Sequence, residues 1–236
     1  MTFTIVNTDD KSDHKEVIMH RLGTIIIALL VVSFGAAAAH AQTGYISAVH
    51  GIPGLEEPVD VYANGGYLFS FDFGETFGPA PVDAGIYNLE VYYQGSPVVD
   101  LSGTVEVEDG GNYTAVAHLD EAGAIAPLSL FVNEMSPIRR WFARLQIHHL
   151  AAAPTVDASV RRGWSRFPVL ELSGISNGEQ TTATDIRFGR YNIGLLAGDA
   201  EVFNTGKLRI GYGSNTAVYA IGVFPDSFEL VYLPLN

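Results

Sequence analysis

Apolar and polar residues alternate along much of the chain after residue 42. In IYNLEVYY, residues 86–93, one face of an extended strand carries Tyr87, Leu89 and Val91, and the other carries Asn88, Glu90 and Tyr92. TVEVE, residues 104–108, sets two valines against two glutamates in the same way. This period of two, interrupted about every 8–12 residues by Gly, Pro, Asn or Asp, is typical of a β-sandwich. The pattern therefore predicts an all-β fold.

The same strand pattern occurs twice. GIYNLEV at 85–91 returns as GRYNIGL at 189–195, GTVEV at 103–107 as GKLRI at 206–210, PVDV at 58–61 as TVDA at 155–158, and TAV at 114–116 as TAV at 216–218. The matches keep their order along the chain, at offsets of 97–104 residues, which indicates an internal repeat. We therefore expect two tandem antiparallel β-sandwich domains, over 44–134 and 142–236. A linker at 135–141 joins them, and Ser136-Pro137 marks it because proline ends strands.

The N-terminus has the pattern of a secretory signal peptide. A short basic stretch at His20-Arg21 precedes the apolar run 22–39, and an A-x-A site ends at Ala41. Cleavage after Ala41 would remove an extension and signal peptide over residues 1–41 and predicts a secreted or periplasmic protein. The alternative is an uncleaved anchor helix, because the apolar run is just long enough to span a bilayer. After cleavage, nothing in the sequence predicts attachment to a membrane.

Charge is distributed unequally between the two halves. Residues 42–134 contain fourteen acidic residues and no lysine or arginine, whereas all ten later bases lie from Arg139 onward, beside eight acidic residues. The halves therefore carry formal charges of −14 and +2, within a chain whose net charge is −13. Nucleic acid is a poor partner for so acidic a first half.

Aligning the repeats shows where the sign of the charge changes. Glu106 in the first copy corresponds to Arg209 in the second, while the flanking apolar residues are kept. Ile86 likewise becomes Arg190. Such a charge-reversed face predicts either packing of the two domains on each other or head-to-tail self-association between chains.

The duplicated polar residues are two histidine–aspartate pairs, His50 with Asp60 and His149 with Asp157. One reading is a metal or acid–base site. We favour a structural reading, in which each imidazole bonds to the neighbouring strand's carboxylate and pins the intervening loop. His118 corresponds to Ala220 in the TAV alignment, which indicates a histidine without a repeated role.

Motifs of established chemistry are missing from the sequence. It has no cysteine, so thiol catalysis and thiolate metal sites are excluded, and it has no G-x-S-x-G, H-E-x-x-H or phosphate-loop motif. No cofactor is predicted. The aromatic stretch 67–77 places Tyr67, Phe69, Phe71 and Phe73 on one face, which is either the core of the first domain or an open binding platform.

The first copy resembles a family of secreted bacterial proteins, domain of unknown function 4397. The resemblance rests on Val49-His50, Pro53-Gly54, the segment PVDVY at 58–62 and the segment DAGIYNL at 83–89. It implies an immunoglobulin- or prealbumin-like sandwich, usually in tandem copies, and it implies no activity. The second copy departs from the pattern, with three alanines in place of the Pro-Gly loop.

Together these features predict an exported, non-enzymatic protein that acts as a binding or envelope-structural module, with an unknown protein or glycan partner at the cell envelope. The alternative is a carbohydrate- or calcium-binding module that uses acidic loops of the first domain. A hydrolase is the weaker alternative, because neighbouring carboxylates on a strand do not face each other across a cleft.

Overall fold

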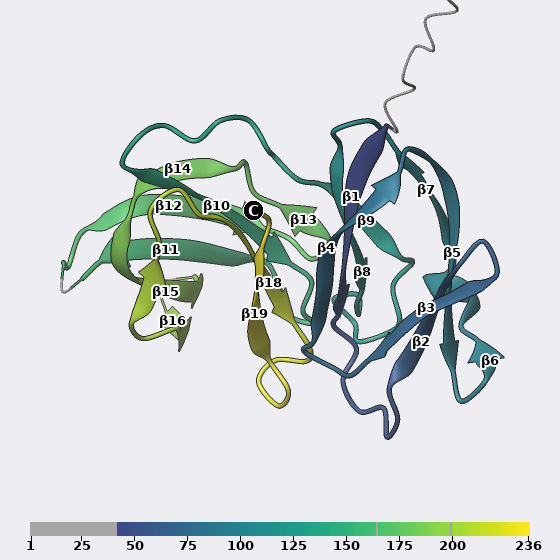
Figure 1. The fold of residues 1–236 in the computed structure, drawn as a ribbon. Helices are drawn as coiled ribbons and strands as arrows, with labels where there is room; N and C mark the ends of the chain where they lie inside the picture. Colours follow the sequence, from purple (N-terminus) through teal and green to yellow (C-terminus); the bar gives the residue numbers. More distant parts are fainter. Residues whose placement is uncertain (1–41, 164, 199) are drawn as a thin grey trace, which may run out of the picture. The chain divides into compact units, whose positions relative to one another are not determined.

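The computed structural model describes residues 42–163, 165–198 and 200–236; the predicted signal peptide lies outside them. The described residues of the first half form nine strands and one 3-10 turn (Figure 1). These are β1 (Thr43–His50), β2 (Val59–Ala63), β3 (Gly66–Phe71), β4 (Thr76–Asp83), β5 (Gly85–Tyr93), β6 (Ser96–Pro97), η1 (Val99–Leu101), β7 (Gly103–Val107), β8 (Asn112–Ala117) and β9 (Ser129–Val132).

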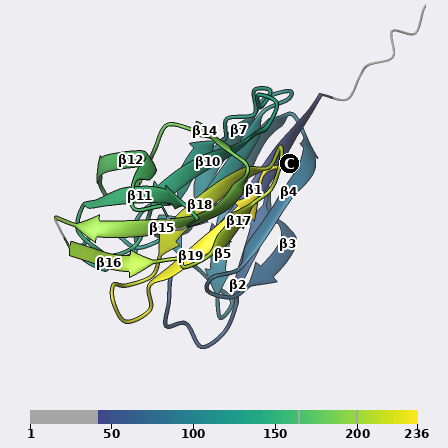
Figure 2. The ribbon, with the colours of Figure 1, turned by 90° about the vertical axis from the view of Figure 1, so that its left-hand side faces the viewer.

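The second half contains the remaining strands, of which β11, β15 and β16 are seen together in Figure 2. They are β10 (Phe142–His149), β11 (Val156–Arg162), β12 (Pro168–Ile175), β13 (Glu179–Gln180), β14 (Thr184–Arg187), β15 (Gly189–Ala197), β16 (Ala200–Asn204), β17 (Leu208–Ile210), β18 (Asn215–Ile221) and β19 (Glu229–Pro234). The all-β prediction is confirmed for the described residues.

Each half consists of two sheets with the same strand order. We call β4-β1-β8-β9 the first inner sheet and β3-β2-β5-β6, with β7 on β5, the first outer sheet. The second inner sheet is β13-β10-β18-β19, with β14 on β10, and the second outer sheet is β12-β11-β15-β16, with β17 on β15. Pairing is antiparallel except for one parallel pair in each inner sheet, β1 with β8 and β10 with β18. The alternating pattern predicts strands but not this parallel pairing.

Apolar clusters show which sheets pack together. Val61 and Leu89 belong to clusters between the first inner and outer sheets, and a third cluster fills the second sandwich. A fourth cluster joins the halves, because Val49 and Val116 of the first inner sheet pack with Tyr219 and Ile221 of the second. Both inner sheets are therefore covered on both faces, and all six residues of β8 are buried.

The strand register corrects one part of the repeat alignment. Ser47 pairs with Thr114 in the first half, and its counterpart Gln146 pairs with Ala217 in the second. Thr114 therefore corresponds to Ala217, one residue beyond the TAV match, and His118 corresponds to Ile221 instead of Ala220. A shift of one residue exchanges the two faces of a strand, so only the structural register assigns side chains to the correct layer.

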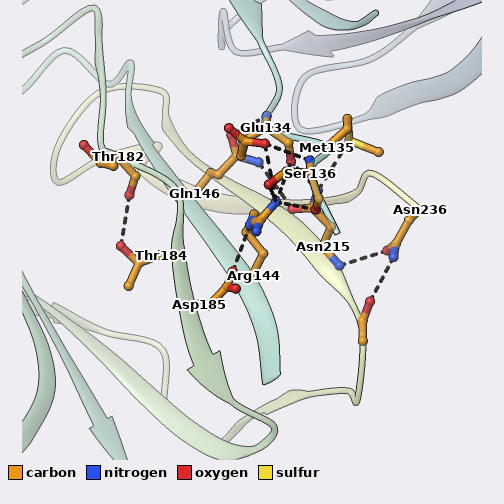
Figure 3. Close-up of polar contacts among 11 residues, drawn as sticks. Glu134, Met135, Ser136, Arg144, Gln146, Thr182, Thr184, Asp185, Asn215 and Asn236 are labelled. Carbon is orange, nitrogen blue, oxygen red and sulfur yellow. Dashed lines mark hydrogen bonds and ion pairs between the residues drawn. The ribbon is translucent and has the colours of Figure 1, made fainter. Parts of the chain in front are cut away.

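The segment between the halves is held by a buried arginine of β10, Arg144 (Figure 3). Its Nη1 donates to the Ser136 carbonyl oxygen at 2.8 Å, and its Nε bonds to Asp185 Oδ1 at 2.9 Å. Asn215 Nδ2 donates to the Glu134 carbonyl oxygen at 2.8 Å. The guanidinium has five donors in a fixed plane and satisfies several backbone acceptors at once. The predicted linker is thus fastened to the second inner sheet.

Candidate binding face of the first outer sheet

The first predicted pair, His50 and Asp60, is not hydrogen-bonded. His50 ends β1 in the inner sheet, where its Nδ1 accepts a bond from the Ile52 amide at 3.4 Å and its Nε2 has no partner. Asp60 lies in β2 of the outer sheet and accepts a bond from the Ser70 hydroxyl. The prediction of a pair was wrong, because Asp60 alternates with the buried Val59 and Val61 and its side chain therefore points away from the inner sheet.

The second pair, His149 and Asp157, is likewise not hydrogen-bonded. His149 Nε2 lies 3.0 Å from the Pro154 carbonyl oxygen, and its Nδ1 has no partner. Asp157 accepts a bond from the Gly174 amide at 2.7 Å. Each histidine therefore contacts the backbone of the loop that follows it, and each aspartate bonds across to the next strand of its outer sheet. The duplicated residues fix two separate local structures in each half.

Burial keeps these histidines neutral. Removal from water lowers the pKa of His50 to about 4, against a smaller opposing effect of Glu75. Burial also lowers the pKa of His149, with the Pro154 and Ala153 carbonyl groups opposing it. His148 is enclosed between the inner sheets, where its ring stacks on Tyr219 at 4.3 Å, and burial lowers its pKa to about 3. None of these side chains is placed on a surface that a substrate could reach.

The charge-reversed residues occupy equivalent exposed positions. Glu106 of β7 pairs with Ile86 of β5, and Arg209 of β17 pairs with Arg190 of β15. Both lie on outer sheets, whereas the two halves pack through their inner sheets. Packing of these two faces on each other within one chain is therefore excluded. Head-to-tail contact between chains stays a prediction.

The aromatic stretch is divided among several environments. Phe71 is buried, Phe69 stacks on Phe77 at 3.9 Å beside an apolar cavity of about 40 Å³, and Phe73 packs against the cluster that joins the halves. Tyr67 is 56% exposed, so it does not share the face of Phe71. A register shift between Val61 and Tyr62, opposite β3, breaks the alternation that the sequence predicts.

This shift places three tyrosines together on the free face of the first outer sheet. The Tyr62 ring lies 5.6 Å from that of Tyr67 and 4.9 Å from that of Tyr92. Glu90 stands opposite Tyr62, and Asp60 stands opposite Tyr92. We call these five residues the tyrosine face. Ser70 connects its polar groups, because its hydroxyl contacts both Asp60 and the Tyr67 hydroxyl.

The described residues offer neither a metal centre nor a membrane-spanning helix. They contain no group of three or more His, Asp or Glu side chains arranged to hold a metal ion. Nor do they include a helix of the length and hydropathy needed to cross a bilayer. The tyrosine face is thus the candidate site that the geometry of the first half supports best.

Comparisons with known proteins place part of the chain in a family. No curated protein matches it. Among solved structures, "The Bacillus anthracis TIE protein" is 14% identical with a TM-score of 0.20; the match covers 83% of this chain and 32% of that one, so the chain spans about a third of that protein. The family model described as "Domain of unknown function (DUF4397)" matches residues 44–159. Over these residues the chain belongs to the DUF4397 family.

Proposed function

We propose that this protein is an exported, non-enzymatic binding module that holds a glycan on the tyrosine face. The observation that carries the proposal is the row of Tyr67, Tyr62 and Tyr92 beside Asp60 and Glu90 on an open sheet. Sugar rings present apolar C–H faces that pack on aromatic rings, and their hydroxyl groups donate to carboxylates. Export is supported by the signal-peptide pattern in residues 1–41.

The chemistry of this face favours a neutral or amino-bearing glycan. Its only charged groups are carboxylates, and the sequence from 42 to 134 offers no lysine or arginine to attract an anion. The tyrosine rings are tilted by 74° and 56° to one another. Such tilted rings do not form a flat platform, so we expect them to fit a single flexible glycan chain better than a crystalline surface.

The corresponding face of the second half lacks every tyrosine. The counterparts of Tyr62, Glu90 and Tyr92 are Ser159, Gly194 and Leu196. The Glu201 side chain lies over Gly194 and forms an ion pair with Arg161 at 2.9 Å. The Glu201–Arg161 ion pair therefore covers the part of the second outer sheet that corresponds to the tyrosine face. We expect this part of the second outer sheet not to bind a glycan.

Glycan-array screening of the purified protein, followed by calorimetry with the best neutral or amino glycan, tests the proposal. We expect Tyr67→Ala to weaken binding at least about tenfold, equivalent to roughly 1.4 kcal/mol. Tyr45→Ala is the matched control, because Tyr45 is an exposed tyrosine of β1 outside this face. The proposal fails if no glycan binds, or if both variants bind as the parent does.

The same calorimetry separates the calcium alternative. Calcium binding that Asp60→Asn abolishes, without any glycan binding, would assign the acidic residues of this face to a metal. Hydrolysis of the bound glycan would support the hydrolase alternative. Hydrolysis is not expected, because Asp60 and Glu90 lie diagonally on one face of a sheet and do not face each other across a cleft. Calcium binding is not expected, because no third carboxylate of the described residues joins these two in a metal-binding group.

A further inference from the structure

A second group of exposed aromatic rings lies at one corner of the second sandwich. The Trp141 ring is 6.3 Å from that of Phe188 and 5.7 Å from that of Tyr212, and the latter two rings are 5.9 Å apart. The three residues come from the segment before β10, the β14–β15 turn and the segment after β17. All are exposed, Tyr212 at 59%. Three large rings gathered in solvent are unusual on a monomer and mark an interaction site.

Arginines surround these rings. Arg190 and Arg209 pair directly across β15 and β17 and, with Phe188 and Tyr212, line an open pocket of about 370 Å³. The Arg140 guanidinium lies 4.8 Å from the centre of the Trp141 ring. Like charges directly opposite each other on a sheet are destabilising. Among the described residues, neither Arg190 nor Arg209 has a carboxylate within salt-bridge distance.

The first sandwich shows that the fold does not need these side chains. The Phe188 amide donates to the Trp141 carbonyl oxygen, and at the equivalent corner the Ala84 amide donates to Gln42 in the same way. The strand registers assign the remaining counterparts: Ile86 for Arg190, Glu106 for Arg209 and Asp109 for Tyr212. The backbone is kept while five side chains change, from glutamine, alanine, isoleucine and two acidic residues to three aromatic and two basic residues. Packing therefore does not explain the change.

Trp141 adds a local strain. Its φ is +71°, a left-handed conformation that is rare and strained for a bulky residue. Such strain persists where the surrounding structure enforces it, and strained positions cluster at ligand sites. Here it holds an exposed indole ring against Phe188 and Tyr212.

We infer that this corner, the arginine–aromatic pocket, binds an acidic saccharide through its carboxylate groups. The planar guanidinium groups of Arg190 and Arg209 match carboxylates in bidentate geometry, and the rings pack against the sugar. The pocket lies within the usual volume range of small-ligand sites, about 300–1,000 Å³. The acidic first half repels long polyanions, which favours a short acidic segment over nucleic acid. This site is separate from the tyrosine face.

Titration of the purified protein with an oligogalacturonate tests the inference, with a malto-oligosaccharide of equal length as the uncharged reference. We expect the acidic oligosaccharide to bind preferentially and more weakly as salt increases. The double variant Arg190→Gln/Arg209→Gln should raise the dissociation constant at least about tenfold. The single variant Tyr212→Ala should do the same. Arg166→Gln is the control, because Arg166 is exposed between β11 and β12 and does not line the pocket. Circular dichroism and thermal melting confirm that each variant is folded.

Several results would overturn the inference. These are equal binding of the two oligosaccharides, unchanged affinity in both pocket variants, or tighter binding of inorganic polyphosphate or a single-stranded oligonucleotide. Sedimentation tests a further contrary outcome, in which the protein assembles with itself in a salt-sensitive way. If both Glu106→Arg and the double arginine variant abolish that assembly, the pocket binds a second copy of this chain. Loss of oligogalacturonate binding in the pocket variants, with neutral glycan binding kept, separates this site from the tyrosine face.

Discussion

The inner and outer sheets of this protein differ in how far the two copies have diverged. The inner sheets pack on each other, and each places a histidine, His50 or His149, at the same strand end. The outer sheets keep one face free, and there tyrosines and carboxylates in the first copy correspond to serine, glycine and arginine in the second. Burial on two faces restricts which side chains fit, whereas a free face can change its chemistry at little cost in stability.

The largest expected effect concerns the segment that links the two halves. Arg144→Met removes the buried donors that fasten the Ser136 carbonyl and Asp185 to β10, while both acceptors stay open to water. We expect the free energy of unfolding to fall by about 2 kcal/mol. Urea unfolding followed by tryptophan fluorescence measures it. Arg166→Met, at an exposed arginine, is the control. An equal, small loss in both variants would mean that the linker contacts contribute little.

Acid should destabilise the inner sheets before it affects the outer faces. Burial lowers the pKa of His50 to about 4 and that of His148 to about 3, whereas both titrate near 6.5 in the unfolded chain. Below pH 6.5 the unfolded state therefore binds more protons, and stability falls with pH until each folded-state pKa is passed. From pH 6.5 to 5.5 the loss is about 1 kcal/mol for each of these histidines.

Thermal melting between pH 7.5 and 4.5 measures this loss. His148→Phe keeps an aromatic ring between Phe131 and Tyr219 and removes one titrating group. We expect the melting temperature of this variant to fall less between pH 7 and pH 5 than that of the parent. Relative to the parent, the variant should therefore be more stable at pH 5 than at pH 7. A parent protein whose melting temperature is constant over this range would contradict the assignment of the histidines as neutral core residues.

The smallest effect is expected on the outer sheets. Asp60→Ala removes a bond from Ser70 on a half-buried surface, so the free energy of unfolding should fall by less than about 1 kcal/mol. Asp157→Ala, which loses the Gly174 amide, is the matched change in the second copy. Urea unfolding at pH 7 measures both. A loss of about 2 kcal/mol or more from Asp60→Ala would indicate that His50 does depend on this carboxylate.

The tyrosine face was only partly predictable. Alternation in β5 correctly places Glu90 and Tyr92 on one face of the strand and Leu89 and Val91 on the other. It fails for Tyr67, because a register shift in the β2–β3 pair is invisible to a period of two. In the arginine–aromatic pocket, the repeat alignment identified Arg190 and Arg209 but not the aromatic residues beside them. The signal in the sequence was the replacement of Gln42 in the first copy by Trp141 in the second.

The sequence by itself determined the strands, the repeat and the unequal charge of the halves, because each depends on residues close together along the chain or on simple composition. The tertiary structure decided which faces are buried. It separated His50 from Asp60, since they belong to different sheets, and shifted the TAV match by one residue. It also brought Trp141 and Tyr212 together from distant segments. Contacts between sheets depend on register and on which faces pack, and neither is encoded in local alternation.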